Sequence, residues 1–298
     1  MSEPATPRRA GIAARWIDLN LVRLPLMAAI LIAVYIGLQF LRLGVMRLWP
    51  QAPADALAIV AALLLAAAML ALYARMVRRF ERRPVGELAA EGAAARVLGG
   101  AAIGASLFVL VYAALALLGV ARWHGLDAST HLGTALGASL AAAVGEELVF
   151  RGVVFRLLED SFGTTVALIA SAGLFGLAHA GNPGATWTST VAIMLEAGAL
   201  LGLAYAWSRS LWLPIGLHFG WNFTEGGVFG VAVSGGPAHG GLLRVSLEGR
   251  DLLTGGAFGP EASVAAVGAS LAAAAVFGVA AVRAGRWQWL RRRMRYAG

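Results

Sequence analysis

Ionisable and polar residues recur at a spacing of four inside apolar stretches of this chain. The motifs are Glu146-Glu147 with Arg151, Phe175 with His179, and His218 with Asn222. Ionisable groups in a lipid bilayer are costly unless they are paired, so a protein that keeps them there is expected to use them. Carboxylate, imidazole and amide groups together can activate water and stabilise the oxyanion that forms on an attacked carbonyl. These residue types therefore predict hydrolytic chemistry inside a membrane.

Helix geometry separates the two adjacent glutamates. Residues four apart lie on one helix face, so Glu147 and Arg151 are expected to form an ion pair. That pair neutralises a charge that could not otherwise be buried. Glu146 precedes Glu147 by one residue, so its side chain points ~100° away around the helix axis, toward a different helix. We therefore assign water activation to Glu146 as a general base, and scaffolding to Glu147 with Arg151.

The other two motifs supply partners for this carboxylate. Phe175 lies on the same helix face as His179, where its ring can fix the imidazole and exclude water. His218 and Asn222 form a donor pair of the kind that stabilises an oxyanion. Together with Glu146 they predict a water-activating carboxylate, a polarising histidine and an oxyanion hole.

Three residues outside the motifs also qualify as candidates. Glu196 is open to two interpretations, a supporting partner for a histidine or a substrate amine, or a buried carboxyl that is paired or protonated. Glu225 is expected at the mouth of the site. Trp221 suits a place at the same mouth, but an anchor for the end of its helix at the membrane surface is the preferred interpretation.

Membrane helices must position these residues. Hydrophobic residues make up 59% of the chain and charged residues 13%, a composition that soluble domains do not have. At about 1.5 Å per residue, ~20 residues cross a hydrocarbon core of roughly 30 Å. Six apolar segments suited to crossing lie at 24–41, 56–74, 97–121, 132–155, 164–180 and 262–282. Two more, at about 185–207 and 211–223, are interrupted by polar residues, and the second continues weakly to residue 233. The predicted fold class is an all-α membrane protein, a bundle of about eight transmembrane helices.

Arginine placement orients this bundle. All 24 basic residues are Arg, the net charge is +8, and most of the Arg residues cluster at alternate loops. By the positive-inside rule, both termini are predicted to be cytoplasmic. We expect these residues to attract lipid headgroups rather than nucleic acid. The first span is long enough to remain in the membrane, so a cleaved signal peptide is not expected. Cysteine is absent, which excludes disulfides, thiolate metal sites and a cysteine nucleophile.

One membrane domain is predicted, and its segments differ in role. They are a cytoplasmic segment 1–23, helices without motifs at 24–121, a catalytic core at 122–223, a Gly-rich outer loop at 224–261, a last helix at 262–282, and a basic cytoplasmic tail at 283–298. The Gly-rich loop, which lacks obvious helices, suits either a lid or a simple connection. Its role is left open.

Small residues one helical turn apart predict how the helices pack. GxxxG spacings occur at Gly100/Gly104, Gly133/Gly137, Gly198/Gly202 and Gly216/Gly220. Such spacings let helix backbones approach closely, and we expect them to pack within one bundle rather than between two copies. The oligomeric state is not predicted. Counting the helix rise from the cytoplasmic span ends puts Glu146 ~15 Å deep, His179 ~22 Å, His218 ~12 Å and Asn222 ~18 Å. One shared site is therefore geometrically allowed.

In order and spacing, the motifs resemble the CPBP (Abi) family of intramembrane proteases, which includes the type II CAAX prenyl proteases. The matching residues are EELVFR at 146–151, FGLAH at 175–179 and HFGWN at 218–222. The resemblance is close from about Ala135 to Asn222, and the first three spans carry no motif. It implies an endopeptidase buried in the membrane, with Glu146 and His179 activating water and the last motif binding the oxyanion. Family members are described both as metalloproteases and as glutamate-dependent proteases.

The residue types in the motifs bear on whether the protein needs a metal ion. A zinc site is allowed by Glu146, His179 and His218, with Glu147 as the base. An HExxH pattern is absent, and Arg151 beside the carboxylates disfavours a cation. We expect chemistry without a cofactor, with Zn²⁺ as the alternative.

Two other classes of function compete with a protease. A secondary transporter would show inverted repeats, and none is apparent. A non-catalytic binding or immunity protein would be expected to have lost a motif residue, whereas all are present. We expect a multi-pass protein of the cell membrane, bacterial by its Arg-only and Ala/Gly-rich composition. Its expected partners are membrane lipids and a membrane-associated peptide or protein substrate. Neither the identity of that substrate nor its lipidation is predicted.

Overall fold

Helices make up most of the computed structural model, which describes residues 20–127, 130–238 and 240–289. They are α2 (Asn20–Leu48), α3 (Ala54–Met76), α4 (Ala93–Leu117), α5 (Leu132–Glu147), α6 (Arg156–Phe162), α7 (Thr164–His179), α8 (Trp187–Ile193), α9 (Ala199–Ser208), α10 (Trp212–Phe223), α11 (Asp251–Thr254) and α12 (Val264–Arg283). Segments of π-helix continue several of them, at Val77–Glu81, Leu148–Phe155, Met194–Gly198 and Thr224–Val228. Most of the predicted N-terminal segment 1–23, up to residue 19, and the basic tail from residue 290 lie outside the described residues.

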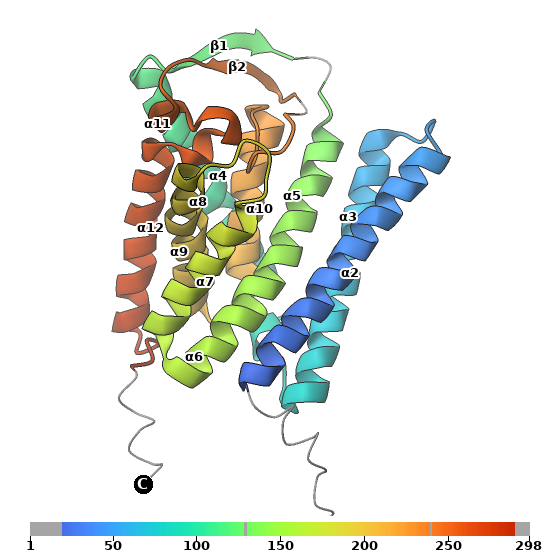
Figure 1. Cartoon of the computed structure of the whole chain (residues 1–298), viewed down its shortest axis with the longest axis vertical. Coiled ribbons are helices and arrows are strands. Elements are labelled where there is room, and N and C mark those ends of the chain that lie inside the picture. The colour runs from blue at the N-terminus through green and yellow to red at the C-terminus, as the bar shows by residue number, and fades with distance from the viewer. Residues whose placement is uncertain (1–19, 128–129, 239, 290–298) are drawn as a thin grey trace, which may run out of the picture.

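The helices have the lengths and composition of membrane spans. Within the described ranges, five are long and apolar enough to cross a membrane, at Asn20–Leu48, Ala54–Glu81, Ala93–Leu117, Trp187–Ser208 and Val264–Arg283. The predicted class of helical membrane protein is thus supported. Helices also cover the other predicted spans, but α7 has only 16 residues and α10 only 12. The exact number of eight spans therefore stays a prediction. So does the side of the termini, although α2 starts and α12 ends at the same end of the bundle (Figure 1).

A two-stranded sheet caps the opposite end of the bundle (Figure 1). Strand β1 (Ala121–Leu126) pairs antiparallel with β2 (Leu243–Leu247), with a register shift between Trp123 and Gly125. These two strands were not predicted, and the segment 224–261, in which no helices were obvious from the sequence, contains β2 and the short helix α11. Each strand is too short to be recognised alone, and the two are remote in sequence. Their backbone groups are satisfied only when the helices bring them together.

Helices α4 and α10 touch backbone to backbone through two pairs of glycines. A Cβ atom added to Gly104 would lie 2.1 Å from the carbonyl oxygen of Leu217. One added to Gly220 would lie 2.1 Å from the carbonyl oxygen of Ala101. Only a hydrogen atom fits at such distances, so these glycines set the helix separation. The contact fixes α10, which carries the third motif.

The remaining GxxxG spacings also serve contacts within the chain. A Cβ atom on Gly137 of α5 would lie 2.5 Å from the carbonyl oxygen of Ala58 on α3. One on Gly198 would lie 2.9 Å from Cα of Ala172 on α7. The prediction that these glycines pack one bundle is confirmed.

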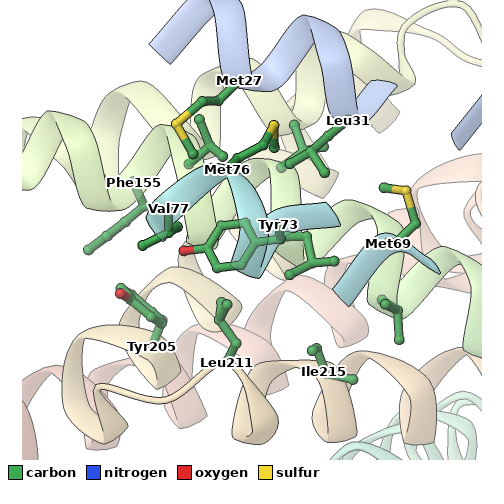
Figure 2. Packing of buried hydrophobic residues seen from close by; sticks show 14 of the residues in the cluster. Met27, Leu31, Met69, Tyr73, Met76, Val77, Phe155, Tyr205, Leu211 and Ile215 are labelled. Carbon is green, nitrogen blue, oxygen red and sulfur yellow. The ribbon is translucent and has the colours of Figure 1, made fainter. Parts of the chain in front are cut away.

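Methionine, leucine and aromatic side chains fill the space between α2, α3 and the rest of the bundle (Figure 2). Tyr73 is fully buried among them, and its hydroxyl lies 2.5 Å from Oε1 of Glu87 and 3.0 Å from the carbonyl oxygen of Gly152. Arg156 donates from Nε to the same carbonyl at 2.8 Å. These bonds anchor the π-helical segment Leu148–Phe155, which begins directly after the two glutamates of the first motif.

The connector between α3 and α4 folds back against the bundle. Glu87 is 6% exposed and accepts bonds from Arg83 at 2.7 and 2.8 Å. Glu81 accepts two bonds from Arg156, at 2.5 and 2.6 Å. This ion-pair network ties the connector to the segment that follows the first motif.

Candidate active site

The three motifs meet at one cavity of about 390 Å³. Its polar lining includes Glu146 from α5, His179 from α7, His218 and Asn222 from α10, Glu196, Asn182, Ser234 and Glu261. Phe175, Leu217, Trp221 and other apolar residues complete the wall. The overlapping depths predicted from the helix rise therefore correspond to a shared site.

Glu147 and Arg151 form the ion pair that their spacing predicted. Nη1 of Arg151 lies 2.8 Å from Oε1 of Glu147, and neither side chain is exposed. The guanidinium also donates to the carbonyl oxygens of Ala197 and Gly198, at 2.9 and 3.1 Å, and stacks over the ring of Phe175 at 4.7 Å. These carbonyls lie at the end of the π-helical segment Met194–Gly198, where the altered hydrogen-bond pattern leaves backbone groups to be satisfied from outside. The buried guanidinium of Arg151 is thus bound by groups from two helical segments, its own and Met194–Gly198.

His179 is oriented by its own helix. Its Nδ1 lies 2.8 Å from the carbonyl oxygen of Phe175, and the two rings are 4.7 Å apart. A carbonyl only accepts, so Nδ1 carries the hydrogen and the neutral ring has its lone pair on Nε2. That atom lies 3.8 Å from Oε2 of Glu146. The predicted role of Phe175 in fixing the imidazole agrees with this packing.

His218 is oriented by the buried ion pair. Its Nδ1 lies 3.1 Å from Oε1 of Glu147, the same oxygen that Arg151 binds. An ionised carboxylate accepts, so Nδ1 again carries the hydrogen. The Nε2 atom lies 4.0 Å from Oε2 of Glu146. Both histidines therefore direct Nε2 toward the same carboxylate oxygen.

Glu146 remains outside the ion pair, as helix geometry predicted. Its side chain is 26% exposed, and Oε2 is buried without a hydrogen-bond donor among the described residues. The distances to the two histidine Nε2 atoms exceed hydrogen-bond length. A water molecule between these atoms can donate to Oε2 and to the Nε2 atom of one neutral imidazole, and it can accept from the other Nε2 atom when that ring is an imidazolium. The arrangement can therefore hold and polarise water.

The residues that flank the third motif lie deeper than expected. Trp221 was predicted to anchor the span end, but it is 3% exposed, and its Nε1 donates to Oε2 of Glu225 at 3.2 Å. Glu225 was predicted at the mouth and is fully buried. The reason is the π-helical segment Thr224–Val228, which extends α10 and keeps both residues inside the bundle.

Glu196 lies at the cavity wall and is 3% exposed. It interacts with the charge of Arg151 and with Ser270 of α12. Glu261, which the motifs did not indicate, lines the same cavity and is 2% exposed. The only available signal for it was an acidic residue directly before the last apolar span. Residues of the Gly-rich loop, among them Val233 and Pro237, also line the cavity.

The separations between the side chains of the motifs bear on the alternative zinc site. A tetrahedral zinc ion with bonds of about 2.0–2.1 Å holds its ligand atoms about 3.3 Å apart. The separations from Glu146 to His179 and His218 are 3.8 and 4.0 Å. In the described part of the chain, no group of three or more His, Asp or Glu residues has a geometry that could hold a metal ion. As arranged here, the residues do not fit zinc.

Comparison with known proteins finds one family model that matches part of the chain. Residues 128–224 match the model of the Rce1-like type II CAAX prenyl endopeptidases. No curated protein and no solved structure matches the chain. The matched segment contains all three motifs, and the resemblance drawn from them is thereby confirmed.

Proposed function

Because residues 128–224 match the Rce1-like CAAX prenyl endopeptidases, we propose that this membrane protein hydrolyses peptide bonds with a water molecule activated by Glu146. One observation carries the proposal. Oε2 of Glu146 faces Nε2 of both histidines, at 3.8 and 4.0 Å, inside a cavity. Residues that served packing alone would be expected to satisfy one another directly.

Water activation uses Glu146 and His179. An oxygen atom about 2.8 Å from each partner fits between atoms that are 3.8 Å apart, so water can donate one proton to Oε2 and the other to Nε2. The water oxygen then attacks the carbonyl carbon, and Glu146 takes up the proton that is lost. When the C–N bond breaks, Glu146 returns this proton to the leaving amine, which regenerates the carboxylate.

Asn222 and His218 are proposed to bind the oxyanion. The amide of Asn222 donates in any protonation state. His218 already commits Nδ1–H to Glu147, so it donates from Nε2 only as an imidazolium. The carboxylate of Glu147 stabilises that cation. Arg151 and Phe175 hold this arrangement in place but do not touch the substrate.

The proposed substrate is a membrane-associated peptide or protein. The motifs lie on helices of a membrane protein, so a cleaved segment must reach them from the lipid or from a membrane surface. We propose a multi-pass protein of a bacterial cell membrane, with membrane lipids around it and no nucleic-acid partner. Its composition makes a prenylated protein a poor candidate for the natural substrate.

Cleavage of a quenched fluorescent peptide library by the detergent-purified full chain tests this function. We expect the wild-type protein to release fluorescence and Glu146→Ala to lose about 10²–10⁴-fold in rate, the contribution of a general base. His124→Ala, an exposed histidine of β1, serves as the control. Equal rates for wild type and Glu146→Ala would overturn the mechanism. A parallel reaction with a metal chelator is expected to retain full activity, and loss that added Zn²⁺ restores would overturn the metal-free assignment.

A further inference from the structure

Two buried carboxyl groups lie beside the cavity but outside the motifs. Glu225 is 0% exposed and Glu261 is 2% exposed, and only Glu261 lines the cavity. The two carboxyl groups influence each other, and like charges in adjacent buried carboxyls favour a proton on one of them. Neither Glu225 Oε1 nor Glu261 Oε1 receives a bond from an N–H or O–H donor of the described residues. The pair therefore brings at most one negative charge to the wall of the site.

No arginine side chain of the described residues enters the cavity to balance this charge. Carboxyl groups from Glu146, Glu196 and Glu261 line the cavity, and no Arg is among the described residues that line it. Arg151 lies behind the wall, already bonded to Glu147 and to two carbonyl oxygens. Buried carboxylates without a partner are costly, so this wall suits a cation that arrives with the ligand.

The rest of the cavity suits the stem of a long side chain. Its apolar lining includes Ile193, Leu200, Leu217 and Val233. Lysine and arginine side chains combine an apolar stem with a charged head, so the stem can pack on these residues while the head reaches the carboxyl groups. A small metal ion would use the charge but not the apolar wall.

We propose that the cavity binds a Lys or Arg side chain of the substrate beside the scissile bond, with Glu261 as the charge partner. This inference rests on the proposed endopeptidase function and adds the class of residue that the site selects. Glu261 then determines specificity, whereas Glu225 shares a proton with it and holds it in position.

Matched peptides test the inference on the wild-type chain. Two peptide sets carry either lysine or norleucine, which has the same stem without the charge, at each position around the bond that the library identifies. We expect kcat/KM to be at least about tenfold higher for lysine at one position, because a desolvated ion pair forms there. Equal values at all positions would overturn the inference alone. If the wild-type protein cleaved neither set, the proposed endopeptidase function itself would fail.

Variants of the carboxyl residues then show which of them pairs with the lysine of the peptide. Glu261→Gln is expected to reduce the lysine-to-norleucine ratio toward one. Glu225→Gln is expected to preserve it, since the glutamine amide can donate to Glu261 as the shared proton did. Glu248→Gln removes an exposed carboxylate outside the cavity and should leave the ratio unchanged. An unchanged ratio in Glu261→Gln would overturn the assignment. If that variant does not fold, the wild-type comparison of lysine with norleucine still decides whether the site selects a cation.

Discussion

Nη1 of Arg151 lies 2.8 Å from Oε1 of Glu147, and both side chains are completely buried. Glu147→Gln leaves this guanidinium without its carboxylate, and Arg151→Met leaves the carboxylate without its cation. We expect each variant to lose about 3–5 kcal/mol of stability, since an uncompensated charge stays buried. Thermal unfolding of the full chain in detergent measures this loss.

The double variant Glu147→Gln/Arg151→Met is the matched control for that prediction. It removes both charges together, so its loss should be smaller than the sum of the two single losses. Strictly additive losses would contradict the view that the two charges stabilise each other.

Asn222 and His218 are expected to act mainly on the rate of the chemical step. Removing either donor by substitution with alanine should lower kcat by about 10²–10³-fold and change KM little, because the oxyanion exists only after attack. Steady-state kinetics with the best library peptide separates the two constants. A rise in KM with kcat preserved would indicate substrate binding instead.

Gly220 and Gly268 form a matched pair for testing helix packing. A Cβ atom at Gly220 would lie 2.1 Å from the carbonyl oxygen of Ala101, whereas one at Gly268 meets nothing within 4 Å. Gly220→Ala should destabilise the protein by about 1–3 kcal/mol, the usual cost of overpacking. Gly268→Ala should be neutral or slightly stabilising, because alanine favours helix. Unfolding midpoints that shift equally would contradict this assignment of the α4–α10 contact.

Acid is expected to weaken the connector network through Glu87. Burial raises the pKa of this carboxyl, but the hydrogen bonds from Arg83 and Tyr73 and the charge of Arg156 outweigh burial, so the pKa is lower than usual. The folded protein thus releases this proton at a lower pH than the unfolded chain. Its stabilising contribution is complete above the unfolded pKa of about 4.3 and is lost as the pH falls through the lower folded value.

Unfolding midpoints of wild type and Glu87→Gln across pH 3 to 7 would measure this effect. The difference between the two proteins should be largest near neutral pH and should shrink under acid. A difference that grows as the pH falls would contradict the direction of the shift.

Local spacing predicted the features that depend on one helix alone. The ion pair of Glu147 with Arg151 follows from a separation of one turn, and the different direction of Glu146 follows from a rotation of ~100°. The prediction that GxxxG pairs pack the bundle succeeded for a related reason. A stripe of small residues marks a close approach whichever helix lies opposite.

Features that depend on contacts between segments remote in sequence were predicted less well. The strands Ala121–Leu126 and Leu243–Leu247 were missed, since neither is stable without the other. Trp221 was expected at the surface because the π-helical extension of α10 has no recognisable spacing. Glu261 was not predicted as a cavity residue because no motif surrounds it in the sequence.

By itself, the sequence determined the membrane class, the three motifs and the different directions of the two adjacent glutamates. These depend on apolar content and on the helical repeat, which every segment carries locally. Only the tertiary structure decided that both histidines direct Nε2 at Glu146, and that the carboxyl groups of Glu196 and Glu261 line the same cavity. The physical reason is that helix faces meet according to packing between remote segments, and no single segment encodes its partner's position.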